Sequence, residues 1–143
     1  MGTQVSGIID KIYVDYNSVV HRGQVIAELD KTNLLSELAS AQSNLSNAQS
    51  NLSYQTNNYH RFEALYEKGL VSANDFENAK LSYEQALQQV KVQQQNVTKA
   101  QTNLGYATIT SPIDGVVLSK EVEEGQTVAS AMTTPTLFLL AQD

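Results

Sequence analysis

The chain has 143 residues, about the length of one domain. It contains no cysteine, and its 15 acidic and 9 basic residues give a net charge of −6. These values exclude a disulfide scaffold and a thiolate metal site. They also argue against a nucleic-acid surface, which requires clustered Lys and Arg.

Residues 1–30 predict short β-strands separated by turns. Gly7 is followed by Val14, Asn17 and Val20, and residues 25–29 read VIAEL, with the alternation typical of a strand. Asn17 stands where a turn needs a positive φ, which Asn tolerates. This segment is predicted to be the first half of a small β-domain.

A polar segment follows in which residues 41–54 read AQSNLSNAQSNLSY, a repeat of seven residues. Such a repeat predicts a coiled-coil helix, here over about residues 32–68, rather than disorder. A second heptad pattern predicts an antiparallel partner helix over about 73–105. Layers of large residues are expected to pair Tyr59 with Tyr83. The whole seam is expected to comprise Leu38, Leu45, Leu52, Tyr59, Tyr83, Val90, Val97 and Leu104.

Residues 69–72 have the composition of a chain reversal between the two helices. Gly69 suits the left-handed position that ends the first helix, with Leu70 following it in a Schellman motif. Ser72 suits the N-cap of the second helix, and Asp75 stands three residues later, as in a capping box. The predicted hairpin spans residues 31–106, and its helices are about 50 Å long.

Residues 107–143 repeat the pattern of the first segment. Gly115 is followed by Val122, Gly125 and Val128 at the same offsets as in the first half. Each half is too small to bury a core alone, so the two are expected to pack together. The predicted fold class is α+β, with a two-helix coiled-coil hairpin inserted between the halves of one β-sandwich.

These split half-motifs resemble the two halves of a biotinyl/lipoyl domain. With a hairpin between them, the chain resembles the periplasmic adaptors, or membrane fusion proteins, of tripartite efflux and type I secretion systems. Residues 107–115, ATITSPIDG, and residues 125–128, GQTV, are most similar to the MacA-type members that work with ABC transporters. The resemblance implies a barrel-sandwich hybrid fold. It also implies that an anchor and further domains belong to a longer protein.

The same resemblance implies partners and a location. The partners are a TolC-like outer-membrane channel and an inner-membrane transporter, with the ABC class favoured and the proton-driven RND class possible. The protein is expected in the periplasm of a Gram-negative bacterium, attached to the inner membrane in its full-length form. It is expected to form a homo-hexamer in the assembled pump and to have no nucleic-acid partner.

The family's tip motif, R-x3-L-x6-S, is matched by Arg61, Leu65 and Ser72. In the family these residues dock on the channel. Leu65 and Ser72 also have purely structural interpretations, as a Schellman contact and an N-cap. Arg61 has no carboxylate three or four residues away, so it is the strongest candidate for a partner contact.

The resemblance further implies a pore loop in the second β-half, matched here by Ala131, Met132 and Thr133. The family often has Gln at the apex, where this chain has Met132. This difference argues against a constriction of hydrogen-bonded Gln side chains, whereas a ring of Met side chains would narrow the pore as a soft apolar constriction.

Two alternatives belong to other functional classes. Lys31 stands where biotinyl or lipoyl carriers have their modified lysine, although a helix begins there in place of the β-turn that carriers require. A generic coiled-coil tether would explain the heptads but not the split β-domain. An enzyme is not expected, nor is any cofactor or metal, because His21 and His60 are far apart and have no ligand-spaced partners. Glu121, Glu123 and Glu124 are interpreted as a solvated turn.

Overall fold

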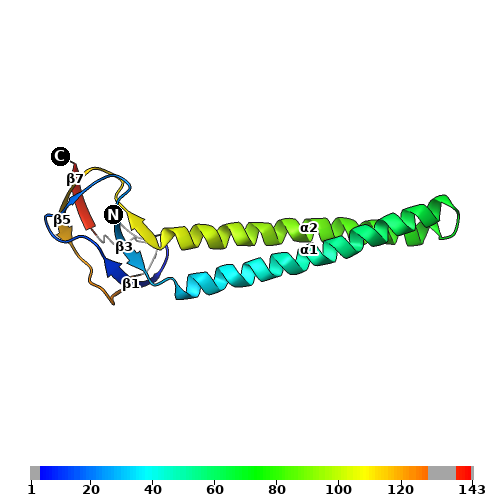
Figure 1. Ribbon diagram of the computed structural model, residues 1–143, viewed down its shortest axis with the longest axis horizontal. Helices are drawn as coiled ribbons and strands as arrows, with labels where there is room; N and C mark the ends of the chain where they lie inside the picture. Colours follow the sequence, from blue (N-terminus) through cyan, green and yellow to red (C-terminus); the bar gives the residue numbers. More distant parts are fainter. Residues whose placement is uncertain (1–3, 129–137, 143) are drawn as a thin grey trace. The chain divides into compact units, whose positions relative to one another are not determined.

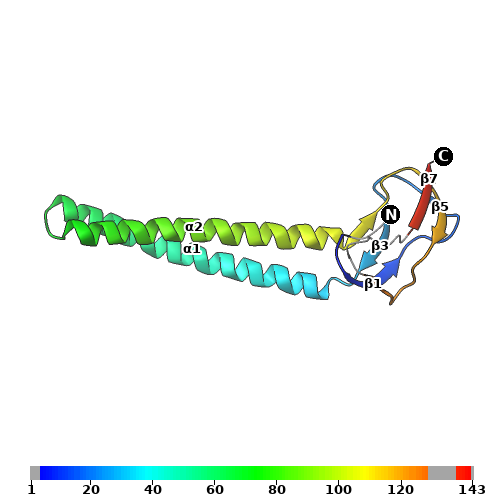
Figure 2. The same ribbon diagram turned by 180° about the vertical axis from the view of Figure 1, so that it is seen from behind.

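The computed structural model describes residues 4–128 and 138–142. In these residues, three strands precede two long helices and four strands follow them (Figures 1 and 2). Residues 37–100 form one compact unit, and the described chain on either side of them forms the other. The predicted fold class, a helical hairpin inserted in a sandwich of antiparallel sheets, is confirmed. The element bounds are β1 Gly7–Ile12, β2 Val19–Val20, β3 Val25–Leu29, α1 Thr32–Glu67, α2 Ala73–Tyr106, β4 Thr108–Thr110, β5 Gly115–Lys120, β6 Thr127–Val128 and β7 Phe138–Gln142.

The β-domain consists of two antiparallel sheets. One has the strand order β4-β3-β1-β6, and the other has the order β2-β5-β7. The second half of the sequence therefore contributes β4 and β6 to the sheet of the first half, where they pair with β3 and β1, and the first half contributes β2, which pairs with β5. This exchange explains why neither half is expected to fold alone.

The two halves also share their irregularities. The register of β1 shifts between Ile9 and Lys11, and that of β5 shifts between Val117 and Ser119. Asn17 has φ 66° and Gly125 has φ 86°. Each is the third residue of a turn that is closed by a backbone bond, from Ser18 to Asp15 (3.1 Å) and from Gln126 to Glu123 (3.1 Å). A positive φ at that position is typical of a type II turn.

The core of the β-domain consists of aliphatic side chains from both halves. Such a core is expected where the inner faces of two sheets pack against each other. Its buried members are Ile9, Val14, Val20, Ile26, Ala27, Leu29, Ala107, Ile109, Val117, Val122 and Val128.

The helical unit is an antiparallel pair, and α1 and α2 lie side by side in both views (Figures 1 and 2). Small residues at alternate seam positions are buried, namely Ala41, Ala48, Ala79, Ala86 and Ala100. Ala41, Val97 and Ala100 form one cluster, against which Leu38 and Leu45 pack. A narrow seam of this kind is the geometry that heptad spacing produces.

The helices begin where the sequence predicts, but their ends differ by one residue. The first ends at Glu67 instead of 68, because the chain turns at Lys68 and Gly69. The second continues to Tyr106 instead of ending at 105. It then closes with a backbone bond of 3.2 Å from Ala107 N–H to the Leu104 carbonyl.

Candidate docking site at the hairpin tip

A Schellman motif ends α1. Gly69 has φ 71°. Its N–H donates to the Tyr66 carbonyl (3.0 Å), and the Leu70 N–H donates to the Leu65 carbonyl (2.8 Å). These are the two bonds that define the motif. They hold Leu65 and Leu70 in a fixed arrangement at the tip.

Ser72 is the N-cap of α2. Its Oγ accepts a hydrogen bond of 3.0 Å from the Asp75 N–H, and its carbonyl accepts one of 3.1 Å from the Phe76 N–H. The reciprocal bond of a capping box, from the Ser72 N–H to the Asp75 carboxylate, is absent from the described part of the chain. The Asp75 carboxylate is therefore not used in capping.

Aromatic side chains close the seam beneath the tip. The ring centroids of Tyr59 and Tyr83, the pair expected to face each other, are 5.0 Å apart. Tyr59 also lies edge-on to Phe76 at 5.8 Å. Tyr66 stacks on Phe76 at 4.9 Å with an interplanar angle of 9°. Tyr66 lies seven residues after Tyr59, and Phe76 lies seven residues before Tyr83, so this pair continues the same register toward the tip.

Arg61 is exposed on α1, one turn before Leu65. Over residues 4–128 and 138–142, its side chain has no ion pair or hydrogen bond. Leu65 is half-buried and Ser72 is exposed. The guanidinium is thus a charged, unoccupied donor beside a rigid turn. Its role in docking stays a prediction.

A groove of about 390 Å³ lies between the two helices near the tip. No local sequence pattern marks this tip groove, because its walls come from both helices. Asn58 precedes Arg61 by three residues, so the groove and the arginine share a side of α1. Its lining residues are Asn58, Phe62, Asp75, Asn78, Ala79 and Ser82.

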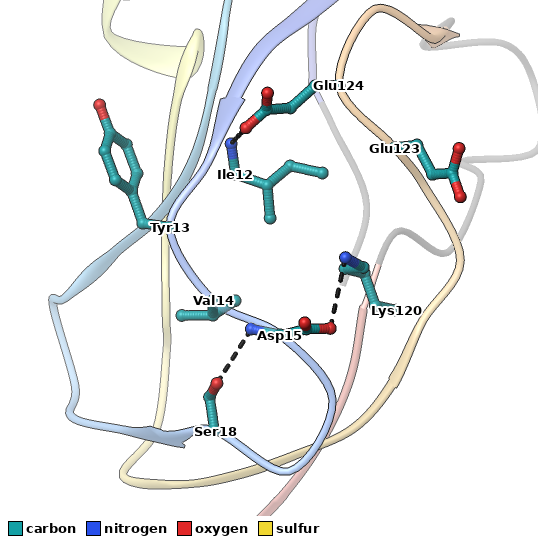
Figure 3. A pocket seen from close by; sticks show the side chains of 8 residues that line it. All are labelled: Ile12, Tyr13, Val14, Asp15, Ser18, Lys120, Glu123 and Glu124. Carbon is teal, nitrogen blue, oxygen red and sulfur yellow. Dashed lines mark hydrogen bonds and ion pairs between the residues drawn. The ribbon is translucent and has the colours of Figure 1, made fainter.

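A second hollow, of about 620 Å³, lies in the β-domain (Figure 3). Two of its acidic side chains already have partners. Asp15 pairs with Lys120 at 3.3 Å, and Glu124 Oε1 accepts a hydrogen bond of 3.1 Å from the Ile12 N–H. The bond to the Tyr16 N–H and the interaction with Lys120 lower the pKa of Asp15. The hollow is lined by Ile12, Tyr13, Val14, Asp15, Ser18, Lys120, Glu123 and Glu124.

These contacts revise the interpretation of the acidic turn. Glu121, Glu123 and Glu124 are all exposed, as expected. Glu124, however, also joins the two halves of the domain through its bond to Ile12, which lies 112 residues away in the sequence. This carboxylate therefore has a structural role in addition to its hydration.

Lys31 lies at the start of α1, and its carbonyl accepts a hydrogen bond of 2.8 Å from the Leu35 N–H. Asp30 caps the start of this helix by its side chain, because its carboxylate accepts a bond of 2.9 Å from the Thr32 N–H. Carrier domains present their lysine on a tight β-turn, whereas Lys31 belongs to a helix N-terminus. The local geometry does not fit a carrier lysine.

The remaining candidates carry no site in the described residues. No group of three or more His, Cys, Asp or Glu there is placed to hold a metal. The His21 and Asp114 side chains approach to 3.9 Å, and both are exposed. None of the helices described is long and apolar enough to cross a membrane. The predicted pore loop, Ala131, Met132 and Thr133, lies outside the described residues.

Comparison with known proteins gives one family match. Residues 1–140 match the family model described as RND MFP, barrel-sandwich hybrid domain. The match includes both β-halves and the hairpin between them, so it covers every element of the structure except the end of β7.

Similar curated proteins are longer than this chain. Multidrug resistance protein MdtA of Pantoea ananatis is 32% identical over 131 residues, which are 92% of this chain and 32% of the relative. MdtA of Yersinia enterocolitica is 29% identical over 137 residues, which are 96% of this chain and 31% of the relative. The chain thus spans about a third of the length of these relatives.

Solved structures with the same fold include MacA from Actinobacillus actinomycetemcomitans. It aligns with a TM-score of 0.64 and 37% identity over 99% of this chain and 48% of that structure. A chimera of MacA and MexA, containing the α-hairpin domain of Pseudomonas aeruginosa MexA, aligns with a TM-score of 0.64 and 38% identity. That alignment covers 99% of this chain and 46% of the chimera.

Proposed function

This chain belongs to the membrane fusion proteins, a family of periplasmic adaptors, and on that premise we propose that it links an inner-membrane transporter to a TolC-like outer-membrane channel. Proteins of this family are adaptors and not enzymes. The proposed function is therefore a mechanical connection in an efflux or secretion pump, located in the periplasm and attached to the inner membrane in the full-length protein.

The observation that carries the proposal is the state of Arg61. It is an exposed guanidinium with no intramolecular partner in the described chain. It lies one helical turn from a Schellman motif that fixes the backbone of Leu65. The planar guanidinium of an arginine binds carbonyl or carboxylate oxygens with up to five N–H donors. Arg61, Leu65 and Ser72 are the proposed contacts with the channel.

The two parts of the chain have different roles in this proposal. The hairpin, residues 31–106, supplies reach, and its outer face is rich in uncharged Asn, Gln and Ser that suit contacts with neighbouring hairpins. The β-domain, residues 1–30 and 107–143, forms a ring in a homo-hexamer. The loop with Ala131, Met132 and Thr133 is proposed to face the central pore.

Two classes of transporter each have an observation in their favour. The similarity to the MacA structure, at 37% identity, supports the ABC class that the local sequence resemblance favours. The family description names RND proteins, which supports the proton-driven class. Co-purification of the full-length protein with each class of transporter from the same bacterium distinguishes the two.

The docking role is tested by capture of a purified TolC-like channel. We expect Arg61→Asp to abolish capture by this chain without changing its helix content, because it replaces a donor with a repelling carboxylate. Lys91→Asp is the matched control, since Lys91 is also an exposed cation on the hairpin but lies far from the tip in the sequence. Equal capture by the wild type and Arg61→Asp would refute docking through this residue.

A further inference from the structure

The tip groove combines an apolar floor with polar walls and one charge. Ala79 is 6% exposed and Phe62 is half-buried, which makes the floor apolar. Asn58, Asn78 and Ser82 provide amide and hydroxyl groups around it. Asp75 is the only ionisable side chain among the lining residues. A groove of this composition suits a long side chain with an aliphatic stem and a positive end.

The Asp75 carboxylate is available for such a ligand. Its backbone N–H is bound by Ser72 Oγ, so the capping of α2 uses the main chain of Asp75 and not its side chain. Among the residues that the structure describes, no Lys, Arg or His lies within ion-pair distance of Asp75. A carboxylate in the first turn also stabilises a helix by its interaction with the helix dipole, but that effect requires no groove.

Arg61 and Asp75 have opposite charges on the same part of the hairpin. Asn58 and Phe62 line the groove, and they lie three residues before and one residue after Arg61. A partner that covers both the groove and the neighbouring surface of α1 would meet the anion of Asp75 and the cation of Arg61. Complementary charges of both signs fix the register of an interface more strongly than charges of a single sign.

We infer that the tip groove receives a lysine or arginine side chain of the docking partner. The aliphatic stem lies along Phe62 and Ala79, and the charged end is bound by Asp75 with the amide oxygens of Asn58 and Asn78. An arginine gains further from its contact with the Phe62 ring. The inference rests on the proposed function, because it assigns this occupant to the channel and not to a second copy of the chain.

The test measures capture of the purified TolC-like channel by the full chain and its variants. Asp75→Asn removes the charge at constant size, and we expect it to weaken the apparent affinity about fivefold, with the difference shrinking as salt rises. Asp75→Lys places a cation against the basic side chain of the channel, and we expect it to weaken the apparent affinity more than tenfold. Glu77→Lys is the matched control, since Glu77 is an exposed carboxylate of the same helix that does not line the groove. Circular dichroism checks that each hairpin remains folded.

The outcomes separate this inference from the function on which it rests. Restoration of Asp75→Lys capture by reversing one basic residue at the periplasmic end of the channel would establish the pair. Capture that is lost in Arg61→Asp but unchanged in both Asp75 variants would overturn the inference and leave docking intact. Capture that is unaffected by all of these changes would count against the docking role itself. Reduced self-association of Asp75→Lys with normal channel capture would assign the groove to a second copy and also overturn the inference.

Discussion

Asn17 and Gly125 occupy equivalent positions in the two halves of the β-domain and make the same contact with the opposite half. The Asn17 N–H donates to the Val117 carbonyl at 2.8 Å, and the Gly125 N–H donates to the Ile9 carbonyl, also at 2.8 Å. Both donors have positive φ, 66° and 86°. The left-handed turn in each half thus positions the bond that joins it to the other half.

This relationship predicts the effect of substitutions at the two turns. Asn17→Val and Gly125→Val should each destabilise the β-domain by about 1–2 kcal/mol, because a β-branched residue tolerates the left-handed conformation less well than Asn or Gly. Asn17→Gly should be neutral or slightly stabilising. A Cβ at Gly125 meets nothing within 4 Å, so the cost there is conformational and not steric. The Val117 amide donates to the Ser18 carbonyl at 2.9 Å. Its hydrogen exchange under native conditions measures the loss of stability of the β-domain.

The control for these variants is Tyr16→Val. Tyr16 lies in the same turn as Asn17, is 70% exposed and does not have a positive φ. Similar protection of the Val117 amide in Tyr16→Val and Asn17→Val would show that the backbone conformation of Asn17 is not the source of the effect.

Replacement by alanine should change the stability of the hairpin in opposite directions at two of its glycines. Gly69 has φ 71° in the Schellman motif, so Gly69→Ala should destabilise the hairpin by about 1 kcal/mol. Gly105 lies within α2 without a positive φ, and an added Cβ there has open space, so Gly105→Ala should stabilise by about 0.5–1 kcal/mol. Thermal unfolding followed by helix ellipticity compares the unfolding temperatures of the two variants. A shift of both temperatures in the same direction would contradict the assignment of Gly69 to the left-handed position of the turn.

Tyr59 should be the main stabilising residue at the tip end of the seam, because its ring contacts those of both Tyr83 and Phe76. Tyr59→Ala should destabilise the hairpin by about 2–3 kcal/mol through lost burial and edge-on ring contacts. Tyr54 is 62% exposed, and its replacement by Ala should change stability by less than about 0.5 kcal/mol. Urea unfolding of both variants tests this difference, and equal losses would place the two rings in equivalent environments.

The start of α1 should depend on pH through Asp30. The hydrogen bond from the Thr32 N–H lowers the pKa of Asp30 below its usual value of 3.8. Between the lowered pKa and 3.8 the unfolded chain binds more protons than the folded one, so stability rises with pH across this range. The contribution is complete above that range and disappears as the pH falls through the folded-state pKa.

The corresponding variant is Asp30→Asn, which keeps an oxygen acceptor but does not titrate. Its unfolding free energy should fall less steeply than that of the wild type as the pH decreases from 5 toward 2. Urea titrations at a series of pH values provide the comparison. Parallel curves for the two proteins would mean that the carboxylate of Asp30 contributes nothing to this dependence.

Several features of the tip follow from the sequence because they depend on neighbouring residues. Gly69 and Ser72 were predicted as the C′ residue of α1 and the N-cap of α2, and the hydrogen bonds of both motifs are present. Each bond spans three to five residues, so residue type and spacing are sufficient to predict it. The half-motif offsets likewise predicted the positive φ of Asn17.

Other features escaped the sequence analysis because their parts come from distant segments. The bond from the Ile12 N–H to Glu124 joins residues 112 positions apart. The tip groove requires Asn58 of α1 and Asp75 of α2 to line the same hollow. Neither pair has a spacing that marks it in the sequence.

The sequence by itself determined the helical hairpin, its turn and the two-part β-domain, because heptads, caps and turn residues act over a few positions. Only the tertiary structure decided that β4 and β6 join the sheet of the first half, that β2 joins the sheet of the second half, and that Asn58 and Asp75 line one groove. The reason is physical. Local motifs are selected by backbone conformation and hydrophobic period, whereas strand partners and grooves depend on how distant surfaces pack.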